Sequence, residues 1–329
     1  MTTATATRSL PARVVDVIVG RREASIALVA VALVIYFAAV SPAFLTMGNI
    51  RVIAQFTAAV AILAAGEVML LICGEIDLSA GHIFALAPFV MLFAMDAGIP
   101  MLAAIPIAMA AAGLVGLING LITIRFGLPS FITTLGMLFL LQGSTLILSG
   151  GFPKPAPREG AIVEIFGGYS FAGMAWALLI AAVMHVVLTN TRWGVYTFAT
   201  GGNPIGAREA GVPTARVKIG NFVITAALAG FAGILESTRI ASVDPLAGGA
   251  DLMFFAVAAS VIGGTALAGG SGTVLGGLLG ALVLGVLRDG FTIQGISAFT
   301  FDVILGVAII ISMALNVRVA RLRRGAMSL

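Results

Sequence analysis

Long apolar stretches follow one another along almost the whole chain, and each is about as long as a helix that crosses a bilayer. Within a stretch the apolar residues are continuous, whereas the strands of a membrane barrel alternate apolar and polar residues. The pattern therefore predicts an all-α polytopic membrane protein with about ten transmembrane helices. The expected spans are Ser25–Phe44, Val52–Cys73, Ala80–Asp96, Met101–Ile124, Phe131–Leu148, Phe171–Leu188, Ile219–Ser242, Leu252–Leu267, Thr273–Leu287 and Phe299–Leu315.

Basic residues between these spans indicate the orientation of the chain, because cytoplasmic segments of membrane proteins are enriched in lysine and arginine. Four arginines precede the first span and four follow the last one. The loop 192–218 has three arginines and one lysine against one glutamate, whereas the charges of the loop 149–169 cancel. We therefore expect both termini and the loop 192–218 to be cytoplasmic, and the loop 149–169 to be external.

Composition supports this class of protein and defines the domains. The chain has 329 residues, of which 60% are hydrophobic and 10% charged, whereas a soluble domain has about 25% charged residues. No stretch outside the spans is long enough to bury a core of its own. We expect a cytoplasmic N-terminal segment over residues 1–24, a single transmembrane domain over residues 25–317 and a basic cytoplasmic tail over residues 318–329.

The residue types argue against catalysis in this chain. Cys73 is the single cysteine, which excludes an internal disulfide, and two histidines are too few to suggest a metal centre. The glycine-rich segments 201–208 and 263–272 lack the lysine of a phosphate-binding loop. We therefore expect no cofactor, no metal, no nucleotide site, no nucleic-acid partner and no enzymatic activity of its own.

Charged residues inside the spans need an explanation, because each costs about 2.5–3.5 kcal/mol at the centre of a bilayer. Glu236 and Arg239 are three residues apart on one helix face, so a structural ion pair near the outer end is the preferred interpretation. Glu67 has no partner at helical spacing. It should face the bundle interior or a cavity, which makes it a candidate residue of a solute pathway.

The segment CGEIDLSAG at 73–81 interrupts two apolar runs with two carboxylates. Asp77 or Ser79 fits the N-cap of the following helix, and Glu75 and Asp77 place negative charge near its start. An acidic break of this kind is also how transporters expose polar groups to a solute. The residues fit both a helix cap and a pathway element.

The segment 203–211 has the marks of a short helix on the cytoplasmic side. Asn203 fits the N-cap, Pro204 the first helical position and Gly211 the C-terminal stop. Such a helix is either a simple loop element or a docking element for a cytosolic partner. Glycines spaced by four residues, at 272, 276 and 280 and at 116 and 120, predict faces for close helix packing, within the chain or between two copies.

Four motifs in order resemble the permease subunits of bacterial ABC importers for monosaccharides, a group that includes the ribose, xylose and arabinose permeases. The resemblance extends over most of the chain from the second span onward, and it implies about ten helices in the inner membrane, surrounded by lipid. It also implies a second permease copy, as a homodimer or a heterodimer, together with two cytosolic ABC ATPase subunits and a periplasmic binding protein that delivers the sugar. The motifs are GEIDLSAG at 74–81, ATGGNPIGAREAGV at 199–212, FAGILESTR at 231–239 and VIGGTALAGGSGTVLGGLLGALVLGVL at 261–287.

The resemblance implies roles for individual residues. GEIDLSAG is similar to a family signature at the translocation path, so Asp77, Ser79 and Glu75 are expected to line or shape that path. AREAG at 207–211 is similar to the element that sits in a groove of the ATPase, and the loop 192–218 is expected to relay motion. The expected coupling residues are Asn203, Pro204, Ala207, Arg208, Glu209, Ala210 and Gly211.

Three positions depart from the family pattern. Met253 and Phe255 stand where many members have acidic residues, and His82 stands where a serine is common. If these side chains face the pathway, the solute is expected to be a less common one, such as a polyol or a modified sugar. The alternative is that they face lipid or a neighbouring helix.

Two other classes of function fit the residues. An ion- or proton-coupled secondary transporter would use Glu67, Glu75, Asp77 and Glu236 as relay groups, and its uptake would collapse with the proton gradient. A membrane scaffold or receptor without transport activity would be insensitive to substitution of Asp77 or Arg208. The ordered motifs and the cytoplasmic helix favour the ABC importer subunit.

Overall fold

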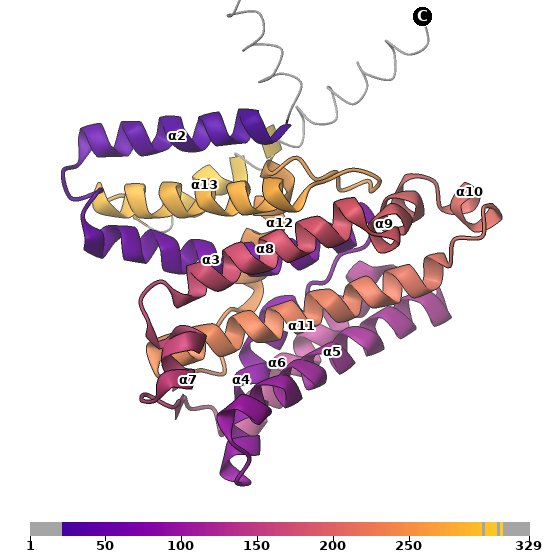
Figure 1. Cartoon of the computed structure of the whole chain (residues 1–329), viewed down its shortest axis with the longest axis horizontal. Helices are drawn as coiled ribbons and strands as arrows, with labels where there is room; N and C mark the ends of the chain where they lie inside the picture. The colour runs from indigo at the N-terminus through magenta and orange to yellow at the C-terminus, as the bar shows by residue number, and fades with distance from the viewer. Residues whose placement is uncertain (1–21, 298–299, 308–309, 312–329) are drawn as a thin grey trace, which may run out of the picture.

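The computed structural model describes residues 22–297, 300–307 and 310–311, which are mostly helical. Figure 1 shows long helices arranged as a bundle, with short helices at its two ends. The described elements are α2 (Arg22–Val40), α3 (Met47–Ile72), α4 (Ala80–Asp96), α5 (Met101–Phe126), α6 (Ser130–Ser149), β1 (Lys154–Pro155), α7 (Ala161–Val163), η1 (Glu164–Gly168), α8 (Ala172–Asn190), α9 (Arg192–Gly202), α10 (Pro204–Glu209), α11 (Thr214–Ile240), β2 (Ser242–Val243), α12 (Gly249–Ile262) and α13 (Val274–Ile293).

Seven of the described helices, α2, α3, α5, α6, α8, α11 and α13, are long and apolar enough to cross a membrane. Helices α4 and α12 are also apolar but have 17 and 14 residues. Most of the helix ends lie within one or two turns of the expected ones, and α4 has the expected bounds. The expected class, an all-helical polytopic membrane protein, is confirmed.

The eighth expected span, Leu252–Leu267, is wrong at its C-terminal end. Helix α12 stops at Ile262, and an irregular segment leads to Val274. Gly264, Gly269 and Gly270 in that segment have φ of 88°, 84° and 76°, a backbone region that glycine adopts and an α-helix does not. The apolar composition of the segment concealed this break.

The chain ends fall partly outside the described residues. Of the tenth expected span, Phe299–Leu315, residues 300–307 are helical. The basic tail over 318–329 and most of the N-terminal segment over 1–24 lie outside the described part of the chain.

Helix α3 forms the centre of the bundle and packs against α8, α11, α12 and α13. Every residue from Val60 to Ile72 is buried. The outer helices instead expose large apolar side chains, such as Ile35 on α2, Phe126 on α5 and Ile147 on α6. Apolar side chains on the outside of a helical bundle are what the hydrocarbon of a bilayer requires.

Glycines bring several helices into backbone contact. A Cβ at Gly116 of α5 would lie 2.3 Å from the carbonyl oxygen of Phe222 on α11, and a Cβ at Gly280 of α13 would lie 2.0 Å from that of Ala259 on α12. The small-residue faces predicted from the glycine spacing therefore pack within the chain. The intramolecular interpretation of these faces is confirmed.

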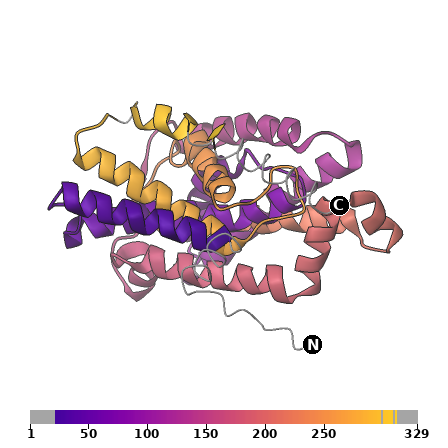
Figure 2. The same ribbon diagram turned by 90° about the horizontal axis from the view of Figure 1, so that it is seen from above.

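The two ends of the bundle carry different structures. Figure 1 shows α7 at one end and α9 and α10 beyond the other, and Figure 2 shows the same arrangement from above. Near α7, β1 and β2 form a short antiparallel ribbon that joins the loop after α6 to the chain after α11. The basic loop 192–218 therefore lies at the end opposite the neutral loop 149–169.

Gly233 offers a test of the packing between α4 and α11. A Cβ there would lie 1.9 Å from the carbonyl oxygen of Phe84, so Gly233→Ala should destabilise the fold by about 1–3 kcal/mol through overpacking. Gly136→Ala is the matched control, because Gly136 lies on an exposed face of α6 with nothing within 4 Å. Thermal unfolding of the purified protein in detergent should show a lower midpoint for Gly233→Ala only; equal midpoints for the two variants would contradict this packing.

Candidate functional site

The break between α3 and α4 is a tight turn that is anchored at its first residues. Gly74 has a φ of 76°, and its N–H donates to the carbonyl of Leu71 over 2.9 Å. The N–H of Glu75 donates to the carbonyl of Leu70 over 3.0 Å, which closes the last turn of α3. Gly270, from the irregular segment before α13, donates its N–H to the carbonyl of Ile72 over 2.8 Å. The end of α3 is thus held by a distant part of the chain.

Asp77 is the centre of a fully buried polar cluster in this break. Its Oδ1 accepts hydrogen bonds from the N–H and the hydroxyl of Ser79, over 2.8 and 2.6 Å. The amide of Asn119 on α5 donates to Asp77, over 3.3 Å to Oδ2, and to the hydroxyl oxygen of Ser79, over 2.9 Å. All three side chains have 0% exposure. The carboxylate therefore has several donors, as a buried charge requires.

Helix α6 satisfies the free backbone groups of the same break. The hydroxyl of Ser130 accepts from the N–H of Ile76 over 3.2 Å, and the hydroxyl of Thr134 accepts from the N–H of Leu78 over 3.1 Å. Thr134 in turn donates its hydroxyl proton to the carbonyl of Ser130 over 2.8 Å. Buried N–H groups outside regular helices need such partners. Residues 76–79 are therefore fixed jointly by α5 and α6.

Glu75 points away from this cluster toward α11. Its Oε1 lies 2.5 Å from Nζ of Lys218, and the two side chains are 10% and 21% exposed. Lys218 lies in the second turn of α11, just after the loop that leaves α10. Glu75 therefore ties the break to the basic end of the bundle and does not share a polar cluster with Asp77.

Glu67 lies within the buried part of α3 with 0% exposure. Neither carboxylate oxygen makes a hydrogen bond of good geometry to a described residue, and the carboxylate is close enough to Asp77 for the two to interact electrostatically. The structure thus brings together two residues that the sequence suggested independently.

The three positions that depart from the family pattern lie in packed surroundings. Met253 is fully buried beside Gly81, at the start of α4. Phe255 stacks edge-on against Phe56 of α3 with ring centroids 5.4 Å apart. His82 is 7% exposed. Met253 and Phe255 both contact a neighbouring helix, and their role in a solute pathway stays a prediction.

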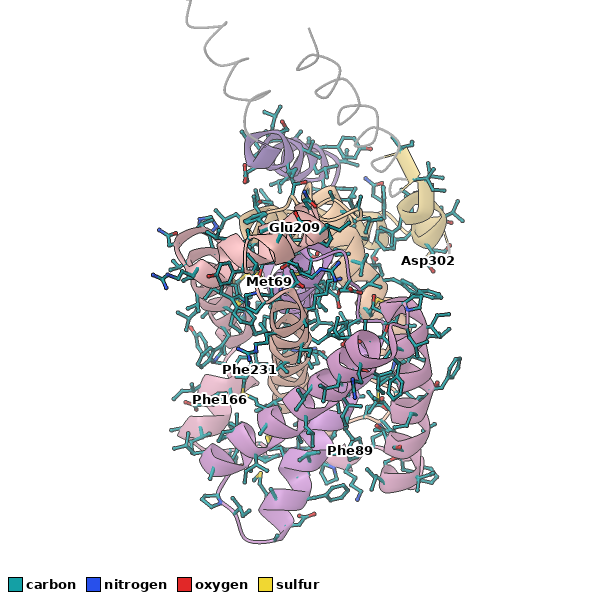
Figure 3. All side chains as sticks on the ribbon, turned by 90° about the vertical axis from the view of Figure 1, so that its right-hand side faces the viewer. Met69, Phe89, Phe166, Glu209, Phe231 and Asp302 are labelled. Carbon is teal, nitrogen blue, oxygen red and sulfur yellow. The ribbon has the colours of Figure 1, made fainter. Side chains whose placement is uncertain are left out.

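The second candidate region is the short helix α10, which has the expected caps. Oδ1 of Asn203 accepts from the N–H of Gly206 over 3.0 Å, and Pro204 occupies the first turn. Gly211 has a φ of 83° and donates its N–H to the carbonyl of Arg208 over 3.0 Å. Figure 3 looks onto this end of the molecule and labels Glu209. The predicted short helix is confirmed.

The candidate coupling residues fall into two groups. Ala207 is 6% exposed and faces inward, so it anchors α10 and presents no surface of its own. The exposed residues are Asn203, Pro204, Arg208, Glu209, Ala210 and Gly211. Ile205, which the sequence did not single out, is 63% exposed between them. The short helix therefore presents an apolar side chain flanked by charged ones.

At the opposite end of the bundle, the predicted pair of Glu236 and Arg239 is confirmed. Nη2 of Arg239 lies 2.5 Å from Oε1 of Glu236, and Nη1 donates to Oε1 of Gln55 on α3 over 3.1 Å. These three residues border a narrow groove between α3, α8 and α11. The ion pair lies within α11, and the hydrogen bond of Arg239 to Gln55 joins α11 to α3, as a structural role predicts.

Several site residues carried weak signals in the sequence. Asn119 is a polar amide in an apolar span, between Gly116 and Gly120, and such groups usually bond to a neighbouring helix. Ser130 and Thr134 share a helix face, but nothing in their spacing shows that they reach the break. The pairing of Lys218 with Glu75 joins residues 143 positions apart and had no local signal. Among the described residues, no group of three side chains is arranged to hold a metal ion.

Comparison with known proteins places this architecture in a family. Residues 49–313 match the family described as "Branched-chain amino acid transport system / permease component". The chain is 38% identical to the xylose/arabinose import permease protein XylH of Sulfolobus acidocaldarius, over 91% of this chain and 86% of that protein. It is 33% identical to the ribose import permease protein RbsC of Escherichia coli K12, over 84% of this chain and 88% of that protein.

A third relative is the probable ABC transporter permease protein YphD of Escherichia coli K12, which is 32% identical over 91% of each chain. No solved structure matches the chain. The family match covers most of the sequence, including the break at 73–79 and the short helix α10. The chain therefore belongs to this permease family and is the multi-pass membrane component of an ABC transport system.

Proposed function

We propose that this permease imports a monosaccharide or a related small polar solute, such as a pentose, a hexose or a polyol. A periplasmic binding protein delivers the solute, and ATP hydrolysis in separate cytosolic ABC ATPase subunits drives its passage through the inner membrane. The names of the relatives support the substrate class, since they are import permeases for xylose, arabinose and ribose. In this proposal the chain crosses the membrane ten times with both termini in the cytoplasm, and the basic loop between α8 and α11 supports that orientation.

The observation that carries the proposal is the geometry of α10. It is capped at both ends, anchored by the buried Ala207 and exposed along the face that bears Ile205, Arg208 and Glu209. A rigid, exposed helix that is too short to cross a membrane suits docking to a partner that moves it as one unit. An ATPase subunit with a groove for an apolar side chain between charged ones is the partner that fits.

The polar cluster at residues 76–79 is the proposed element of the translocation path. It lies where α3, α4, α5 and α6 meet, and its backbone groups leave the helical pattern inside the bundle. Transporters use such helix breaks to expose polar groups to a solute. Asp77, Ser79 and Asn119 together offer donors and acceptors that match sugar hydroxyls once a helix moves away.

We further propose that two copies of the permease pair in the membrane, surrounded by lipid, and that the copies are identical. The glycine faces at Gly116 and Gly280 are occupied within the chain, so they do not form the contact between copies. The outward apolar side chains of α2, α5, α6 and α8 leave room for such a contact.

A proton-coupled secondary transporter is the second candidate function. The fully buried carboxyl group of Glu67 beside Asp77 is the observation that favours it, because relay groups of this kind recur in proton-driven transporters. Its requirement is that Glu67 exchange a proton during each cycle. The ABC importer has no such requirement.

Replacement of both Arg208 and Glu209 with alanine should uncouple the permease from its ATPase. The double variant should fold normally, because both side chains are exposed, but lose most of the co-purifying ATPase and of the ATP-driven uptake. The matched control is alanine at Arg158 and Glu159, the same exposed dipeptide at the other end of the bundle, which should keep the ATPase bound. Affinity purification with quantitative mass spectrometry measures this. An unchanged ATPase yield from the first variant would refute the docking assignment.

Asp77→Ala should impair translocation while the ATPase stays bound, because the variant leaves the donors of Ser79 and Asn119 without their buried acceptor. Glu67→Gln is the comparison. It keeps the volume of the side chain and cannot carry a proton, so an ABC importer should retain its uptake. Radiolabelled solute uptake in proteoliposomes measures both. Normal transport by Asp77→Ala would reduce this residue to a helix cap, and abolished transport by Glu67→Gln would favour the proton-coupled alternative.

A further inference from the structure

Asn221 on α11 connects three parts of the chain that meet at the α10 end of the bundle. The two N–H groups of its side-chain amide are shared among three acceptors, the carbonyl of Met69 at 3.3 Å, Sγ of Cys73 at 3.1 Å and Oγ1 of Thr197 at 3.2 Å from Nδ2. Its Oδ1 accepts from the indole N–H of Trp193 over 2.7 Å. The side chain has 0% exposure. Asn221 on α11 thus joins the end of α3 to α9, the helix that directly precedes α10.

Helix α9 is fixed against α3 and α11 by close contacts on both sides of Asn221. A Cβ on Gly220 would lie 2.4 Å from the indole of Trp193, so the ring lies directly on the backbone of α11. A Cβ on Gly201, near the end of α9, would lie 1.7 Å from the carbonyl oxygen of Ile72. Asn203 follows Gly202 directly and caps α10. A displacement of α10 would therefore also move the end of α3, because no flexible segment lies between them.

A second connection lies one turn earlier on the same helix. Lys218 and Asn221 are three residues apart on α11, and Lys218 pairs with Glu75 in the break. Asn221 holds Met69 and Cys73, just before the break, and Lys218 holds Glu75, two residues before Asp77. Both contacts lie on one face of α11 and act on the same short stretch, residues 69–75.

We propose that Asn221 is a positioning residue that transmits the movement of α9 and α10 to the break between α3 and α4. This inference rests on the proposed function, in which α10 receives the movement from an ATPase. Apolar contacts alone would let the helices slide past one another, whereas a buried amide that bonds to α3 and to α9 at once favours one relative position of the two helices. Movement of α9 therefore carries the end of α3 with it, and the cluster at Asp77 follows.

The substitution Asn221→Asp separates this role from simple packing. The aspartate has the same shape and still accepts from Trp193, but a carboxylate has no N–H to donate to Met69, Cys73 or Thr197. Trp193→Phe is the second variant. It removes the donor to Asn221 together with the outer part of the indole, whose Cζ2 and Cη2 lie over Gly220, so its unfolding midpoint is read beside its coupling.

Thr225→Val provides the matched control on the same helix. Thr225 lies one turn beyond Asn221, is equally buried, and its hydroxyl donates only within α11, to the carbonyl of Asn221. Valine keeps the methyl group that packs on Gly66. The control therefore removes a buried hydrogen bond within α11, while the hydrogen bonds from α11 to α3 and α9 stay in place.

The experiment uses the assembled complex of permease, ATPase and binding protein in proteoliposomes, with ribose or xylose as the probe. The quantity measured is solute transported per ATP hydrolysed, together with ATPase retention and the unfolding midpoint. Asn221→Asp and Trp193→Phe should both keep the ATPase bound and still hydrolyse ATP, but their transport per ATP should fall at least about fivefold, the lower limit typical of coupling between sites. Thr225→Val should keep the wild-type ratio.

The outcomes separate the two proposals. If Asn221→Asp fails to fold, Trp193→Phe decides, because it leaves Asn221 in place and its unfolding midpoint reports the lost ring packing separately. A wild-type ratio in every folded variant, or an equal fall in the Thr225→Val control, would overturn the positioning role of Asn221 and leave the importer intact. A wild-type complex that retains no ATPase would instead refute the proposed function, and the role of Asn221 would fail with it.

Discussion

The buried carboxylate of Asp77 is the constraint on which the rest of this structure depends. A carboxyl group at 0% exposure inside a membrane bundle requires hydrogen-bond partners, and Ser79 and Asn119 provide them. To do so, α5 must place Asn119 beside the break, and α6 must place Ser130 and Thr134 against its backbone. The glycines of α5 allow the close approach of α11 that this arrangement needs. The polar cluster therefore specifies how four helices meet.

Residues of the break between α3 and α4 contact two different parts of the molecule. On one side its residues reach the interior, where Glu67 and Asp77 interact, and on the other side Glu75 and Cys73 contact α11 and α9. The segment that would contact a solute is thus only a few residues from the segment that would respond to an ATPase. In the proposed mechanism, this proximity lets a helix as short as α10 act on a site buried inside the bundle.

The class of fold was readable from the sequence because apolar runs of membrane length and the distribution of arginines are local signals. The caps of α10 were readable for the same reason, since Asn203, Pro204 and Gly211 act within one short helix. The end of α12 was not, because glycines 264, 269 and 270 break an apolar segment without changing its hydropathy. The partners of Asp77 and Glu75 were also hidden, because Asn119 and Lys218 come from helices distant in sequence. Contacts between helices are set by packing, and a single sequence does not report them.

The central claim is that ATP hydrolysis on another chain drives solute through this one, and uptake by the reconstituted complex tests it most directly. Proteoliposomes would contain the permease with its ATPase, and the binding protein would be loaded with ribose or xylose outside. Uptake is predicted to require ATP hydrolysis and to persist when a protonophore collapses the proton gradient. Uptake that proceeds without ATP and disappears with the proton gradient would contradict the account.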